Sequence, residues 1–145
     1  MGNKIEGVII TPLKIISHPL GDIYHALKCS DEGFNGFGES YFSTVHKGDI
    51  KGWKKHLEMT LNLIVPVGKV KFVIYDERKT GKSKEVFEEV ELSLDNYMRL
   101  TIPPGLWVAF QGMNEGLNLL QNIANIEHRP EEALRCELNQ IPYSW

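Results

Sequence analysis

The residues with the greatest capacity for chemistry lie in segment 51–63, which reads Lys-Gly-Trp-Lys-Lys-His-Leu-Glu-Met-Thr-Leu-Asn-Leu. If this segment is extended from Lys54 onward, strand alternation places one polar row on one face: Lys54, His56, Glu58, Thr60 and Asn62. Imidazole titrates near neutral pH, a carboxylate can orient it, and an ammonium can stabilise a developing oxyanion. The row therefore predicts an acid/base site centred on His56 and Lys54. The alternative is a solvated edge strand with scattered charges, which shows the same alternation.

Other features of the sequence argue against a metal site or a phosphate-binding loop. The remaining histidines, His18, His25, His46 and His128, are not paired at HxH or HxxxH spacing, so we expect no metal site. The glycine-rich segment 33–38 lacks the Lys-Ser/Thr pair and the following helix of a P-loop, and we interpret it as a turn. Trp53, Trp107 and Trp145 could stack on a nucleobase, although aromatic residues in a small protein more often belong to the core.

The elements that must position these residues are predominantly strands. Apolar residues repeat with a period near two, and glycine or proline turns recur at short intervals, which predicts an all-β sandwich or closed barrel. The expected strands are 7–16, 22–28, 39–45, 56–65, 69–75, 86–92, 98–102, 106–112 and 117–126. One short C-terminal helix is expected over 129–138, since Pro130 suits its first turn and two glutamates suit the positive end of its dipole.

Length and composition set further limits. A chain of 145 residues suits one domain, 1–145, and 42% hydrophobic with 24% charged residues is typical of a globular protein. The net charge of -3 argues against nucleic-acid binding. No apolar run reaches the length of a membrane span, and the start of the chain lacks the pattern of a signal peptide. The two cysteines are far apart in the sequence and fit free thiols in the cytoplasm, where we expect the protein to reside.

Several ordered motifs resemble one known family. They are Pro66-Val67-Gly68-Lys69-Val70, the following 73–78, Leu92-Ser93-Leu94-Asp95-Asn96, segment 99–105, which reads Arg-Leu-Thr-Ile-Pro-Pro-Gly, and the terminal Ile141-Pro142-Tyr143-Ser144-Trp145. In this order they resemble the G-x-V-x-D-V-x-V-D-x-R, L-S-x-x-N, Q-L-x-I-P-x-G-x-A-H-G-F and I-x-W motifs of the dTDP-4-dehydrorhamnose 3,5-epimerases. The resemblance covers about Gly21 to the C-terminus and implies an RmlC-like cupin, a jelly-roll β-barrel or sandwich.

The resemblance is weaker at the catalytic positions. The family's R-G-L-H histidine removes a proton next to a 4-keto group; here Lys51-Gly52-Trp53 matches the start, and the histidine follows later as His56. The family's tyrosine acid is replaced by Gln121 or Asn122, and Tyr41, Tyr75 or Glu39 are the alternatives for its role. Val108 replaces the histidine of I-P-x-G-x-A-H, and the chain ends before the segment that carries the aspartate partner in the family.

The resemblance implies an epimerase or isomerase that acts on a nucleotide-linked 4-keto sugar without a cofactor, in surface-polysaccharide or deoxysugar biosynthesis. His56 would be the base, Lys54 or Lys51 would stabilise the enolate, and Lys51 and Arg78 would face the diphosphate. The rest of the expected substrate-binding set is Trp53, Glu58, Asn62 and Tyr41. A homodimer is also implied. The alternatives are a non-catalytic cupin that binds a sugar or sugar nucleotide and a metal-dependent cupin, for which paired histidines are missing.

Overall fold

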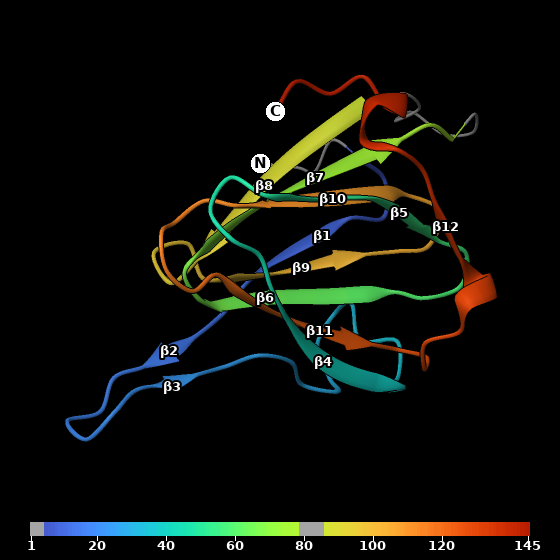
Figure 1. Ribbon diagram of the computed structural model, residues 1–145. Coiled ribbons are helices and arrows are strands. Elements are labelled where there is room, and N and C mark those ends of the chain that lie inside the picture. Colours follow the sequence, from blue (N-terminus) through green and yellow to red (C-terminus); the bar gives the residue numbers. More distant parts are fainter. Residues whose placement is uncertain (1–4, 79–85) are drawn as a thin grey trace.

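Antiparallel strands dominate the computed structural model, which describes residues 5–78 and 86–145 (Figure 1). The strands are β1 (Ile9–Pro12), β2 (Ile15–Ile16), β3 (Ile23–Tyr24), β4 (Glu39–Thr44), β5 (Ile50–His56), β6 (Leu61–Val67), β7 (Lys69–Asp76), β8 (Val86–Ser93), β9 (Met98–Ile102), β10 (Trp107–Gly112), β11 (Leu119–Ala124) and β12 (Ala133–Arg135). Two 3₁₀ turns, Pro130–Glu132 and Leu138–Gln140, flank β12.

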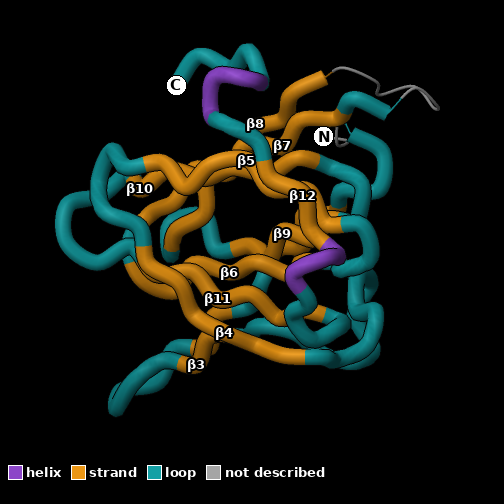
Figure 2. Tube along the Cα trace, turned by 45° about the vertical axis from the view of Figure 1, so that its right-hand side comes forward, coloured by secondary structure: helices purple, strands orange, loops and turns teal. Residues whose placement is uncertain are grey.

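The described strands form two five-stranded sheets that enclose a common interior. One sheet has the order β1-β9-β6-β11-β4 and the other the order β12-β5-β10-β7-β8, while β2 and β3 form a separate two-stranded ribbon. Figure 2 shows the two sheets curving around the interior. The core between them is built from alternate side chains of both sheets, such as Leu100 and Leu120 of the first and Phe72 and Ile74 of the second. The predicted all-β cupin fold is confirmed.

The predicted strand 56–65 is wrong, because the chain leaves the sheet at 57–60. Strand β5 ends at His56 and β6 begins at Leu61. The backbone N–H groups of Glu58 and Met59 both donate to Glu132 Oε2 at 3.1 Å, and that of Thr60 donates to Asn125 Oδ1 at 2.7 Å. Side chains from a distant part of the chain therefore take the hydrogen bonds that a ladder would otherwise use.

The predicted helix 129–138 is also wrong. Pro130–Glu132 forms a 3₁₀ turn, and Ala133–Arg135 then adds as β12 to the edge of β5, with Ala133 opposite His56 and Arg135 opposite Lys54. A helix of ten residues is marginal without tertiary packing, and here the unpaired edge of β5 offers the backbone a better partner.

The first two predicted strands are shortened and bent outward. Segment 7–16 divides into β1 and β2 after Pro12, and only Ile23–Tyr24 of segment 22–28 is strand. The β2–β3 ribbon projects from the body of the molecule (Figure 1). It exposes apolar side chains, including Leu20 at 92% and Ile23 at 56% of their full accessible surface.

The outer face of the β12-β5-β10-β7-β8 sheet is covered by the C-terminal segment. Trp53, Val73, Trp107 and Ala109 are buried there against Ile141, with Tyr143 and Trp145 packed alongside. The Tyr143 hydroxyl donates to Glu89, and the Trp53 indole N–H donates to the backbone oxygen of Leu138 at 3.2 Å. This covered face leaves the opposite face of β5 free to line the interior.

Candidate active site

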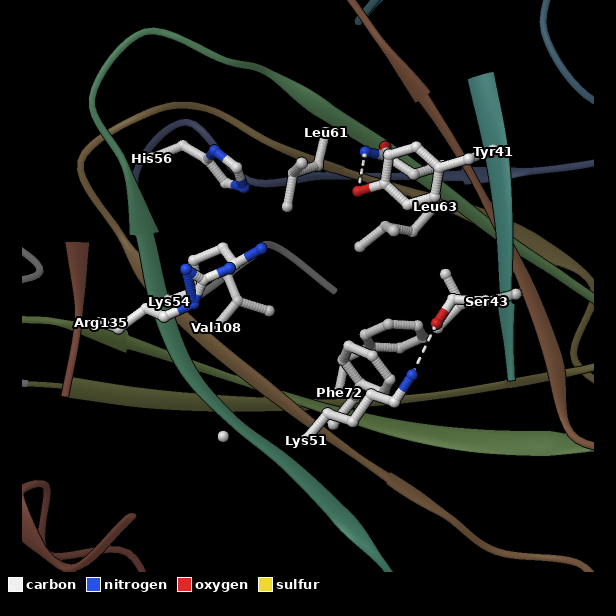
Figure 3. Close-up of a pocket in the computed structure, with 14 residues that line it drawn as sticks. Tyr41, Ser43, Lys51, Lys54, His56, Leu61, Leu63, Phe72, Val108 and Arg135 are labelled. Atoms are coloured by element: carbon white, nitrogen blue, oxygen red, sulfur yellow. Dashed lines mark hydrogen bonds between the residues drawn. The ribbon is translucent and has the colours of Figure 1, made fainter. Parts of the chain in front are cut away.

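A cavity of about 440 Å³ opens at one end of the interior between the two sheets. Its apolar wall consists of Leu61, Leu63, Phe72, Val108, Phe110 and Leu120. Its polar lining consists of Tyr41, Ser43, Lys51, Lys54, His56, Asn122 and Arg135 (Figure 3). An apolar pocket with a few converging polar groups is the usual form of a small-molecule site.

His56 and Glu132 form a buried pair at the edge of this cavity. Nδ1 of His56 lies 2.5 Å from Oε1 of Glu132, and the two residues retain only 7% and 1% of their accessible surface. The other carboxylate oxygen accepts the two backbone N–H groups from Glu58 and Met59, so the carboxylate is fixed in place. Glu132 therefore holds the imidazole ring in one orientation.

The pKa values of this pair favour a neutral imidazole and an ionised carboxylate. Burial lowers the pKa of His56, and this effect outweighs the hydrogen bond and charge of Glu132, which raise it; nearby Lys54 and His128 lower it further. Burial raises the pKa of Glu132, but the hydrogen bonds from His56 and from the Glu58 and Met59 amides bring it below its ordinary value. An ionised Glu132 needs a proton on Nδ1, so Nε2 of His56 carries the free lone pair.

Three cationic side chains share the cavity with His56. Lys54 precedes His56 by two residues on the same face of β5, and Arg135 lies opposite Lys54 on β12. Lys51 also reaches the cavity, because the register between β5 and β10 shifts there: Lys54 pairs with Val108 and Lys51 with Phe110. This bulge brings two lysines spaced three apart onto one face, which a regular strand would not do.

Electrostatic crowding accompanies this arrangement. Burial lowers the pKa of Lys54, and the neighbouring charges of Arg135 and Lys51 lower it further, while Glu132 partly opposes them. Lys51 donates a hydrogen bond to Ser43 Oγ at 2.9 Å. The cavity therefore presents a surplus of positive charge, which suits an anionic ligand.

Tyr41 lies across the cavity from these groups. It comes from β4, and Figure 3 shows its hydroxyl pointing into the cavity on the side opposite His56, Lys54 and Arg135. Asn122 of β11, its direct partner in the sheet, donates a hydrogen bond from Nδ2 to the Tyr41 hydroxyl at 3.2 Å. The two sides of the cavity thus carry different groups, a phenol on one and an imidazole with cationic side chains on the other.

Four residues of the expected set lie outside the cavity lining. Trp53 is 1% exposed in the outer cluster, and Glu58 forms an exposed ion pair with Arg129 at 2.6 Å. Asn62 is buried in the sheet, where it donates to Gly33 and accepts from Thr101. Arg78 pairs with Asp76 at 2.9 Å. Lys51, Lys54, His56 and Tyr41 are the expected site residues that the cavity brings together.

Trp53 provides a test of this division between core and cavity. Trp53→Ala is expected to lower the free energy of unfolding by about 3–5 kcal/mol, because it empties a large buried volume and removes the indole hydrogen bond to Leu138. Urea unfolding measures the loss. A substitution that left stability unchanged but weakened ligand binding would instead show that Trp53 contacts the ligand.

Glu132 and Arg135 are functional residues that the sequence analysis missed. Both were assigned to the expected helix, and Glu58 was the only carboxylate placed near His56. The hydrogen-bonded carboxylate comes from a position 76 residues away along the chain. No local spacing could have indicated it.

Among the described residues, no three His, Cys, Asp or Glu side chains gather in a metal-binding arrangement.

No protein-family model matches the chain. The crystal structure of a dTDP sugar isomerase from Desulfovibrio desulfuricans superposes on it with a TM-score of 0.93 and 35% sequence identity, covering 98% of this chain and 92% of that one. This chain belongs to the RmlC-like family of sugar-nucleotide isomerases and epimerases.

Two further proteins are similar to the chain at lower identity. A probable low-salt glycan biosynthesis epimerase of Haloferax volcanii, Agl13, is 26% identical over 111 residues, covering 73% of this chain and 71% of that protein. The spore coat polysaccharide biosynthesis protein SpsL of Bacillus subtilis is 23% identical over 128 residues, covering 88% of this chain and 85% of that protein. The family resemblance predicted from the sequence motifs is confirmed.

Proposed function

We propose that this protein epimerises or isomerises a nucleotide-linked 4-keto sugar by acid/base chemistry of its own side chains. The observation that carries the proposal is the buried His56–Glu132 pair at a cavity whose charged lining groups, Lys51, Lys54 and Arg135, are cations. The names of the relatives support the same reaction class, since they describe a dTDP sugar isomerase and proteins of glycan and spore-coat polysaccharide synthesis.

His56 acts as the base in this proposal. The carbon next to a keto group loses its proton readily only if the enolate oxygen that forms is stabilised. Nε2 of His56 takes the proton, the C–H electron pair forms the enolate, and the ammonium of Lys54, two residues away on the same face of β5, stabilises the new oxyanion. Glu132 stabilises the imidazolium that results, through the hydrogen bond to Nδ1.

The diphosphate of the substrate is assigned to Lys51 and Arg135. Both line the cavity, and Arg135 has the planar fork of donors that suits a phosphate. Arg78, which the sequence analysis placed at the diphosphate, instead donates from its guanidinium to both carboxylate oxygens of Asp76 and to the backbone oxygen of Glu6. Arg135 therefore replaces it in the proposal.

Arg135→Ala is expected to weaken binding of a nucleoside diphosphate by roughly tenfold or more, since a charged hydrogen bond contributes about 1.5–3 kcal/mol. Isothermal titration with dTDP measures the change. Arg129→Ala is the matched control, because Arg129 pairs with Glu58 outside the cavity lining and should leave the affinity as it is. Equal affinities of the Arg135→Ala variant and the wild type would remove Arg135 from the diphosphate site.

The alternative function is a non-catalytic cupin that binds the same ligand. A dTDP-linked 4-keto-6-deoxyhexose incubated with the protein and followed by NMR separates the two. An enzyme converts it into a new sugar with altered ring couplings, while a binding module shifts and broadens the signals of the unchanged sugar. Saturable binding without conversion would contradict the proposed reaction.

A homodimer and a cytoplasmic location complete the proposal. The projecting β2–β3 ribbon exposes Leu20 and Ile23, and β4 is an edge strand, so a second copy would cover apolar surface and an open edge. Cys29 and Cys136 are free thiols, which suits a reducing compartment. No helix in the described part of the chain has the length and apolar character to cross a bilayer. Light scattering at micromolar concentration tests the dimer, and a monomeric mass would contradict it.

A further inference from the structure

We propose that Tyr41, held by Asn122, is the proton donor that completes the reaction on the side of the sugar opposite His56. This inference rests on the proposed function and assigns the acid that the altered sequence motif left open. In the motif comparison, the tyrosine acid is expected in the strand that contains Asn122, and that strand supplies no tyrosine to the cavity. The structure supplies a tyrosine from the neighbouring strand β4 instead.

The orientation of the Asn122 amide follows from its two neighbours. Its Oδ1 accepts the backbone N–H of Asn62 at 3.1 Å, and a backbone N–H can only donate. The amide oxygen must therefore face Asn62, and the amino group must face Tyr41. Asn122 is 1% exposed, so its contacts with protein groups determine how its amide is oriented.

This orientation fixes the role of the Tyr41 hydroxyl. Because Asn122 Nδ2 donates to it at 3.2 Å, the Tyr41 oxygen is an acceptor in this contact, and its own proton remains available to the cavity. The same donated hydrogen bond stabilises the phenolate that remains after the proton has left. Asn122 thus acts as a positioning residue for Tyr41.

The placement of Tyr41 suits a transfer to the second face of the sugar. His56 and Tyr41 point into the cavity from opposite sides (Figure 3), whereas inversion at a carbon requires removal of a proton on one face and delivery on the other. The other two residues considered for this role do not line the cavity. Tyr75 stacks on Phe87 with ring centroids 4.6 Å apart, and Glu39 begins β4.

All protons and electron pairs of the proposed inversion are accounted for. His56 removes a proton from the carbon next to the keto group, and the bonding pair forms the enolate. The Tyr41 O–H bond then breaks and leaves its electron pair on the phenolate oxygen. The C=C electron pair of the enolate bonds this proton to the same carbon on the opposite face, and a lone pair of the enolate oxygen restores the carbonyl. Water afterwards reprotonates the Tyr41 phenolate and removes the proton from His56.

Tyr41→Phe tests the assignment through two rates measured by NMR in deuterated water, on a dTDP-linked 4-keto-6-deoxyhexose. We expect formation of the inverted sugar to fall by about 10²-fold or more, as for loss of a general acid. Deuterium should still enter the starting sugar with retention, within a few-fold of the wild-type rate, because His56 can return a solvent-exchanged proton. Tyr24→Phe, in the projecting ribbon, is the matched control.

Each outcome of this experiment decides the assignment. Inversion by Tyr41→Phe within about twofold of the wild type would overturn it, and so would the joint loss of inversion and exchange in a folded variant, which would place Tyr41 in proton removal. A wild type that shows neither exchange nor inversion would instead contradict the proposed function itself.

Asn122→Asp tests the positioning role separately. The introduced carboxylate still accepts the Asn62 N–H, but it cannot donate to Tyr41, and it draws the hydroxyl proton away from the cavity. We expect inversion to fall by about tenfold or more while retention-type exchange continues. Asn122→Ser, which restores a hydroxyl donor, should recover part of the loss. Full inversion by a folded Asn122→Asp variant would contradict the role of Asn122.

Discussion

The His56→Ala variant is expected to lose about 10²–10⁴-fold in the rate of sugar conversion, the range typical of an essential general base. The expectation follows from the placement of His56, which is the cavity-lining group with a free basic nitrogen held in position by a buried carboxylate. Lys54, the nearest alternative base on the same face of β5, would have to lose its own proton before it could remove one from the sugar. A coupled NMR assay of substrate and product measures the loss.

His46→Ala is the matched control for His56. The His46 side chain is 88% exposed in the turn before β5, and its partner is Asp49 of the same turn. The control should therefore retain wild-type activity. Full activity in a folded His56→Ala variant would move the base to another residue, with Lys54 as the first candidate.

Glu132→Gln is expected to be nearly as damaging as loss of the histidine, although it removes no atom from the cavity lining. The glutamine carbonyl would turn to accept the Glu58 and Met59 N–H groups, so its amino group would face His56. An amino group donates, which forces Nδ1 of His56 to be the acceptor and puts the proton on Nε2. The ring would then be in the wrong tautomer for proton removal, and we expect a loss on the order of 10²–10⁴-fold.

A pH profile separates this effect from misfolding. The wild-type rate should fall as the pH drops through the pKa of His56, which burial places below the ordinary histidine value, because protonation removes the base. In Glu132→Gln the maximal rate itself should drop, while thermal unfolding should stay cooperative. Glu131→Gln is the control, since Glu131 is exposed and does not contact His56. An unchanged maximal rate in Glu132→Gln would show that the carboxylate does not set the tautomer.

The sequence predicted the parts of the fold that depend on local alternation. Strands β4, β7, β9 and β10 follow the expected segments to within one or two residues, because alternation along each segment and the turn residues near it in the sequence mark them. His56 and Lys54 were placed on one face for the same reason, and both line the cavity. Short-range periodicity is sufficient for such predictions.

The parts of the fold and of the candidate site that the sequence did not predict depend on contacts between segments far apart in the chain. Alternation continued across 57–60 would place Glu58 and Asn62 in the row of His56, but Glu132 and Asn125 bind the backbone there and end the strand. The edge pairing of β12 determines the positions of Glu132 and Arg135, and a bulge turns Lys51 inward. None of these features has a sequence signal of fixed spacing, since each needs the assembled sheet.

The most direct measurement of the central claim is deuterium uptake from solvent into a dTDP-linked 4-keto-6-deoxyhexose, compared between wild type and His56→Ala. We predict that the wild type places deuterium on a carbon next to the keto group and that the His56→Ala variant does so about 10²–10⁴-fold more slowly. Wild-type protein that binds the sugar but exchanges no carbon-bound proton would contradict it.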